Sequence, residues 1–108
     1  MYIDGGIAAC DVSEGYRTEG RGGIYVFSGE GFERIKGSEN AENCAVGTIL
    51  DGKVYFTALF GEENGLFCYD TESGETEKTL SFAAKGRIIY AGQFYCIMTK
   101  TEVICGRL

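Results

Sequence analysis

The chain has 108 residues, of which 44% are hydrophobic and 24% charged. This composition is typical of a single folded domain with a modest core, so we expect one domain over residues 1–108. The formal charge of -6 argues against a nucleic-acid partner, because a protein that binds the phosphate backbone needs a clustered basic face.

The cysteines and the start of the chain bear on its location. Five cysteines, an odd number, occur without a CxxC pair and without any histidine, so the sequence indicates neither a metal site nor a disulfide framework. Free cysteines within strand-like runs favour a reducing compartment. No apolar run reaches the length of a membrane span, and the start MYIDGG lacks the features of a signal peptide. We predict a cytoplasmic protein with no metal, no cofactor and no membrane partner, unless it was cut from a longer secreted chain.

A short pattern recurs three times along the chain. It consists of an apolar residue, two turn residues, one variable residue and a strand, in residues 3–12 (IDGGIAACDV), 50–59 (LDGKVYFTAL) and 90–99 (YAGQFYCIMT). A second strand follows each copy, and the step between the first two copies is close to the ~40–45 residues of a four-stranded propeller blade. The 17 glycines lie between apolar runs, as the turns of an all-β fold require.

The strand pattern divides the chain into three blade-like units, at about residues 1–40, 41–82 and 83–108. With blade strands lettered A to D from the centre outwards, the units read B-C-D, A-B-C-D and A-B-C, about two and a half blades. Ten strands are predicted, at residues 7–12, 22–28, 32–36, 44–50, 54–59, 64–70, 76–81, 87–90, 94–99 and 101–107.

Two longer runs, DGKVYFTALFGEENGLFCYDTESGETEKTL and KGRIIYAGQFYCIMTKTEVICGRL, resemble β-propeller repeats of the kelch-like and YWTD-like type. The chain lacks the Trp and His of the better-defined propeller subfamilies, so the resemblance implies an antiparallel propeller-like fold but no subfamily and no subfamily function. A small β-barrel or sandwich is the alternative fold.

About two and a half blades cannot close a ring of the usual ~4–8 blades. We therefore expect the chain to form a homo-oligomer that completes the propeller. A dimer, with five blade equivalents, is the favoured form.

Candidate binding residues lie in the longer polar connections, at residues 13–22, 37–43 and 60–65, because loops on a rigid sheet commonly carry binding groups. Tyr and Arg are frequent in binding hot spots, and a solvated acidic loop is the alternative for each glutamate. The six candidate contacts are Tyr16, Arg17, Arg21, Glu39, Glu62 and Glu63.

The sequence favours a non-catalytic binding module. Without histidine there is no Ser-His or Cys-His pair, and no carboxylates are brought together by sequence alone, so no catalytic residue is predicted. The module would present its loop-rich face to a protein or small ligand. Two alternatives are a small acidic inhibitor of the phage type, which blocks a basic site on its target, and a lectin-like carbohydrate binder.

Overall fold

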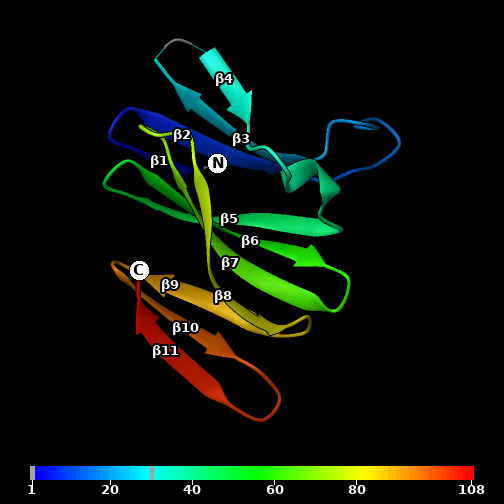
Figure 1. Ribbon diagram of the computed structural model, residues 1–108, viewed down its shortest axis with the longest axis vertical. Helices are drawn as coiled ribbons and strands as arrows, with labels where there is room; N and C mark the ends of the chain where they lie inside the picture. The colour runs from blue at the N-terminus through cyan, green and yellow to red at the C-terminus, as the bar shows by residue number, and fades with distance from the viewer. Residues whose placement is uncertain (1, 30) are drawn as a thin grey trace.

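The computed structural model describes residues 2–29 and 31–108 and shows an all-β chain, as predicted. Eleven strands form three antiparallel sheets that succeed one another along the longest dimension of the molecule (Figure 1). Sheet 1 contains β1 (Tyr2–Asp4), β2 (Ile7–Val12), β3 (Gly23–Ser28) and β4 (Gly31–Arg34). Sheet 2 contains β5 (Asn43–Leu50), β6 (Lys53–Phe60), β7 (Glu63–Asp70) and β8 (Thr76–Ala83). Sheet 3 contains β9 (Arg87–Ala91), β10 (Phe94–Met98) and β11 (Val103–Arg107).

A short 3₁₀ turn, η1 (Ser38–Asn40), joins sheet 1 to sheet 2. Among the described residues, no helix is long and apolar enough to cross a membrane.

The count of ten strands is wrong, because β1 precedes the first predicted strand and completes sheet 1 with a fourth strand. Three residues are too few to show the alternation by which strands are recognised in sequence. The chain therefore forms two four-stranded sheets and one three-stranded sheet. The sheets do not close into a barrel, so the small-barrel alternative is also wrong.

The turns before β2, β6 and β10 set which positions are equivalent in the three sheets. In sheets 1 and 2 both turn residues have positive φ, at Gly5 and Gly6 and at Asp51 and Gly52, as a tight type I′ hairpin requires. Asp4 is therefore equivalent to Leu50, since each ends the strand before its turn. The sequence comparison, which paired residue 3 with Leu50, is one residue out of step.

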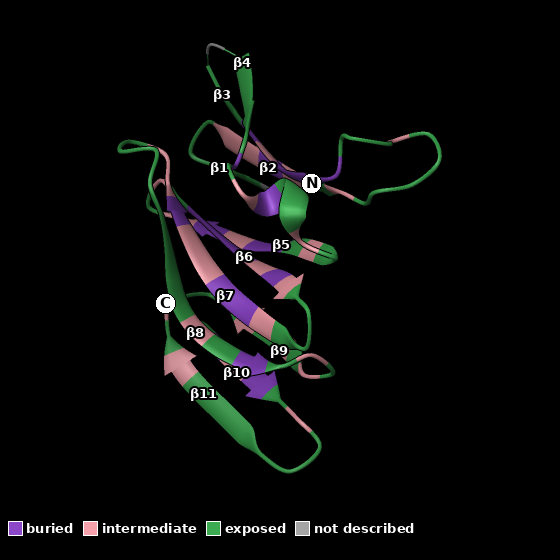
Figure 2. Ribbon diagram, turned by 45° about the vertical axis from the view of Figure 1, so that its right-hand side comes forward, coloured by how far each residue is buried: buried purple, intermediate pink, exposed green. Residues whose placement is uncertain are grey.

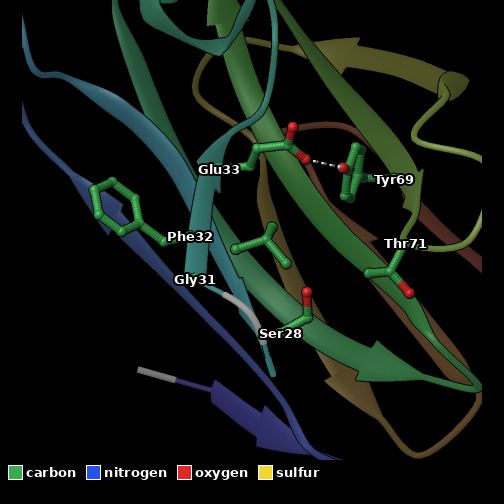
Figure 3. Close-up of a pocket in the computed structure, with 7 residues that line it drawn as sticks. Ser28, Gly31, Phe32, Glu33, Tyr69 and Thr71 are labelled. Carbon is green, nitrogen blue, oxygen red and sulfur yellow. Dashed lines mark hydrogen bonds between the residues drawn. The ribbon is translucent and has the colours of Figure 1, made fainter.

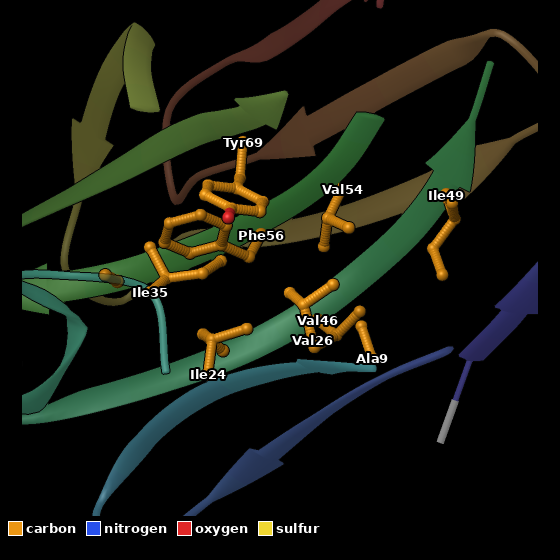
Figure 4. Packing of buried hydrophobic residues seen from close by; sticks show 10 residues of the cluster. Ala9, Ile24, Val26, Ile35, Val46, Ile49, Val54, Phe56 and Tyr69 are labelled. Carbon is orange, nitrogen blue, oxygen red and sulfur yellow. The ribbon is translucent and has the colours of Figure 1, made fainter. Parts of the chain in front are cut away.

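Each sheet has two faces, which we name by its second strand. The forward face carries the first residue of that strand, which is Ile7 in β2, Lys53 in β6 and Phe94 in β10. The rear face is the opposite one. The forward face of sheet 1 packs against the rear face of sheet 2 (Figure 4). Sheet 1 supplies Ala9, Ile24 and Val26, to which Ile35 is added from the residue directly after β4. Sheet 2 supplies Val46, Ile49, Val54, Phe56, Ala58 and Tyr69.

The forward face of sheet 2 packs in the same sense against the rear face of sheet 3. Leu66 and Phe82 of sheet 2 form a buried cluster with Tyr95 and Ile97 of sheet 3. Gly47, beside a β-bulge in β5, faces the ring of Tyr90, and a Cβ atom at this position would overlap that ring. Sheet 2 is consequently covered on both faces, whereas the outermost strands β4 and β11 are exposed (Figure 2).

Two of the five cysteines form a disulfide, contrary to the prediction that all are free. Cys96 and Cys105 lie directly opposite each other in the β10–β11 ladder, with 4.2 Å between their Cα atoms. This short distance is typical of the non-hydrogen-bonded pairs of an antiparallel ladder. Cys10, Cys44 and Cys68 are free and half-buried. The argument for a reducing compartment rested on the cysteines within strand-like runs, and it therefore loses two of them.

Candidate functional site

Tyr16 and Arg17 lie in the connection between β2 and β3, which projects from sheet 1 (Figure 1). Tyr16 is 98% exposed. The connection is held by Glu14, whose carboxylate accepts hydrogen bonds from the backbone N–H groups of Gly20 and Gly22. These bonds lower the pKa of Glu14 because they stabilise its charged form. The residue that orders this loop is thus one that the sequence did not single out.

Arg21 and Glu39 occupy separate places near this connection. The backbone carbonyl of Arg21 accepts a hydrogen bond of 2.8 Å from the Tyr25 hydroxyl, and its side chain borders the rear face of sheet 1. The carboxylate of Glu39 accepts a 3.0 Å hydrogen bond from the N–H of Gly37 at the start of η1. Both residues therefore have local structural roles.

Glu62 and Glu63 lie on sheet 2. The long connection predicted at residues 60–65 is wrong: Gly61 and Glu62 alone separate β6 from β7. Glu63 forms a 2.7 Å salt bridge with Lys78 and accepts a 2.7 Å hydrogen bond from Ser81. These contacts lower the pKa of Glu63. The six residues predicted from sequence thus fall into several groups rather than one site.

A pocket of about 350 Å³ lies between sheets 1 and 2, beside the turns that follow β3 and β7 (Figure 3). The β3–β4 hairpin supplies one wall, and the end of β7 with the residue after it supplies the other. These turns lie at one end of the strands, and the long polar connections lie at the other end. The lining residues are Val26, Ser28, Gly31, Phe32, Glu33, Tyr69 and Thr71.

Glu33 and Tyr69 face each other across this pocket. The Tyr69 hydroxyl donates a hydrogen bond of 3.4 Å to Oε2 of Glu33. Tyr69 as a whole residue is 8% exposed and belongs to the core between the two sheets. Burial, followed by the charge of Glu33, raises the pKa of Tyr69, so its hydroxyl keeps its proton at neutral pH.

The hydroxyl of Thr71, on the same wall of the pocket as Tyr69, also donates a hydrogen bond. Oγ1 of Thr71 donates a 2.6 Å hydrogen bond to the carbonyl of Gly52. Since the Tyr69 proton is directed at Glu33, the oxygens of Tyr69 and Thr71 are left as acceptors. Together with the exposed Glu33 carboxylate, they make the pocket rich in hydrogen-bond acceptors.

Phe32 borders the pocket, but its ring points away from it (Figure 3). That ring packs with Tyr25 and Phe27 on the rear face of sheet 1, at centroid distances of 5.9 and 5.4 Å. The acceptor groups, rather than an aromatic platform, therefore define the chemistry of the pocket.

Neither Tyr69 nor Glu33 is among the six contacts predicted from sequence. The two residues are 36 positions apart, and only the stacking of successive sheets brings them together. In the described part of the chain, no three His, Cys, Asp or Glu side chains are grouped as a metal ion would require. Comparison with known proteins finds no matching family model, curated protein or solved structure.

Proposed function

We propose that the chain is a non-catalytic binding module on a propeller-like scaffold, and that it holds a cationic hydrogen-bond donor in the pocket of Glu33 and Tyr69. The observation that carries this proposal is the orientation of the two hydroxyls, which leaves acceptor oxygens beside an exposed carboxylate. An ammonium group offers three donors and a guanidinium five. Hydrogen bonds from either to a carboxylate are among the stronger ones in proteins.

The charge of the chain favours the same ligand class. With 16 acidic and 10 basic side chains, the chain attracts cations over a distance of about one Debye length, ~8 Å at physiological salt. A free amine or a Lys or Arg side chain of a partner protein would supply the required group. The second source corresponds to the acidic-inhibitor hypothesis, in which the protein blocks a basic site.

The propeller-like scaffold is the second part of the proposal. It is supported by the meander order of the four-stranded sheets, by the forward-to-rear packing at both interfaces, and by the position of β5, which contacts β1, β2 and β3 on one side and β9 on the other. Innermost strands of adjacent propeller blades meet in this way around the axis.

The module is proposed as non-catalytic because the Tyr69 hydroxyl keeps its proton and the Thr71 hydroxyl is bonded to a backbone carbonyl rather than to a base. The raised pKa of Tyr69 makes its phenol a poor base near neutral pH. A lectin-like role is less favoured, since the ring of Phe32 is directed away from the pocket.

Glu33→Gln is expected to weaken binding of a cationic probe by roughly tenfold or more, because a hydrogen bond to a charged group contributes ~1.5–3 kcal/mol. Binding of N-acetyl-argininamide, butylamine and a short Arg-containing peptide would be measured by NMR titration at low salt. Tighter binding of the peptide than of both small amines would identify a protein partner as the source.

Glu102→Gln is the matched control, since it removes the same charge from the exposed turn between β10 and β11 of sheet 3, far from the pocket in the chain. The proposal requires this variant to bind like the unmodified protein. Equal losses in both variants would mean that net charge alone attracts the probes, and an unmodified protein that binds none of them would refute the proposed site.

A further inference from the structure

The forward face of sheet 3 is apolar and uncovered. It surrounds a hollow of about 430 Å³ beside the Cys96–Cys105 disulfide. Four large apolar side chains on this face are strongly exposed: Ile89 53%, Phe94 58%, Met98 39% and Val103 66%. Monomeric soluble proteins rarely expose a contiguous apolar patch of this kind without a partner.

The rear face of sheet 1, at the other end of the stack, is also apolar and uncovered. Ile3 is 73% exposed, Phe27 37% and Phe32 66%. A second hollow of about 430 Å³ lies over this face, between Cys10, Val12 and the aromatic rings. Each end of the three-sheet stack therefore presents an apolar sheet face.

Positions on these end faces are equivalent to positions that are buried inside the stack. Ile24, Leu66 and Val103 occupy equivalent positions on the forward faces of sheets 1, 2 and 3. In each sheet the first residue of the second strand pairs with a residue of the third strand, and these three residues lie four positions before that paired residue. Ile24 and Leu66 are fully buried, whereas Val103 is 66% exposed. The forward faces of sheets 1 and 2 are each covered by the next sheet, whereas no described sheet packs on the forward face of sheet 3.

The rear faces show the same relation. Phe27 and Tyr69 lie one residue before Ser28 and Asp70, which pair with the first residues of β2 and β6. Tyr69 is 8% exposed within the stack, whereas Phe27 is 37% exposed at its end. The two end faces are therefore the two halves of an interface that the chain already forms twice.

Both end faces carry positive charge, so a contact between them depends on apolar packing and on stacking of arginine on aromatic rings rather than on ion pairs. In the described strands of both faces the charged side chains are arginines, Arg34 on sheet 1 and Arg87 and Arg107 on sheet 3, although acidic residues outnumber basic ones in the chain. Arg107 already lies over the Phe94 ring, 5.9 Å from its centroid. Guanidinium groups stack on aromatic rings, and sheet 1 offers three such rings, those of Tyr25, Phe27 and Phe32.

We propose that the occupant of each end face is a second copy of this chain, with the forward face of sheet 3 in one copy packed on the rear face of sheet 1 in the other. This inference rests on the propeller-like stacking proposed above. Two copies with three sheets each would give six sheets, within the ~4–8 blades of closed propellers. A twofold axis would make both contacts identical and leave neither face exposed.

The test is solution mass by light scattering behind a sizing column, over a range of concentrations, with one variant for each face. The unmodified chain is expected at twice its mass of 11.7 kDa. Phe94→Glu and Phe27→Glu should each weaken association by roughly 30-fold or more, as expected for interface aromatic residues. Thr79→Glu, on the exposed strand β8 of sheet 2, is the control and should associate normally.

Mixing the two face variants distinguishes head-to-tail packing from other arrangements. In a mixture of Phe94→Glu and Phe27→Glu chains both substitutions fall on one of the two contacts and leave the other contact intact. The mixture should therefore form more dimer than either variant alone at the same total concentration. Phe27→Glu chains that dimerise alone as tightly as the unmodified chain would overturn the head-to-tail arrangement. An unmodified chain that is monomeric at every concentration would overturn the inference itself.

Failure of this inference would be distinguishable from failure of the ligand proposal. The Glu33 pocket lies between sheets 1 and 2 of a single chain, so a monomeric Phe94→Glu variant should bind the amine probe with unchanged affinity. Loss of dimerisation with retained binding would separate the two properties.

Discussion

Leu66→Ala is expected to lower the free energy of unfolding by about 3 kcal/mol, within the ~2–5 kcal/mol found for Leu deletions in protein cores. Leu66 is fully buried between sheet 2 and sheet 3, beside Phe82, Tyr95 and Ile97. Its removal would leave a cavity between two sheets that are held together mainly by this small cluster. Urea unfolding followed by circular dichroism measures the change.

Ile104→Ala is the matched control for Leu66→Ala. Ile104 lies on the rear face of sheet 3, the face that packs against sheet 2, but it is 36% exposed. Its truncation should therefore cost roughly 1 kcal/mol, since less apolar surface returns to water. If the two substitutions had equal effects, or if Leu66→Ala cost less than the control, the described interface between sheets 2 and 3 would be wrong.

Removal of the Cys96–Cys105 disulfide is expected to cost about 2–3 kcal/mol, because a bond that closes a loop of this length restricts the unfolded chain by that amount. The two cysteines are nine positions apart and join β10 to β11, which forms the edge of sheet 3. The double variant Cys96→Ala, Cys105→Ala would be compared with the unmodified protein by thermal unfolding with and without a reducing agent.

The three free cysteines provide an internal control for this comparison. Because Cys10, Cys44 and Cys68 form no disulfide, a reducing agent should lower the melting temperature of the unmodified protein and leave that of the double variant unchanged. A reducing agent that shifts both proteins, or neither, would contradict the assigned pairing.

Most strands could be predicted because alternation and Gly-containing turns are local signals. The predicted strand at residues 7–12 matches β2, and the turn at Asp51 and Gly52 matches the structure. The missed strand β1 is too short for a periodic signal. The alignment of the first copy of the repeat with the second was one residue out of step, because it matched the apolar residue 3 with Leu50. The spacing of Cys96 and Cys105 about a hairpin was a usable signal, but an odd cysteine count obscured it.

The pocket could not be predicted in the same way. It depends on which face of sheet 1 meets which face of sheet 2, and alternation alone does not fix that choice. Tyr69 and Glu33 belong to different units of the repeat, so no local pattern connects them. Loop composition indicated Tyr16 and Arg17 as contacts, and that role stays a prediction because exposure alone does not show what binds there.

The central claim is that the three sheets stack with forward faces against rear faces, and methyl NOE spectroscopy tests it most directly. NOEs are expected from the Leu66 methyl groups to Tyr95 and Ile97, and from Val46 to Ala9, because these residues share the two buried clusters and β5 packs on β2. This result would establish the same-sense stacking on which the pocket and the end faces depend. NOEs from Leu66 to residues of sheet 1 would contradict it.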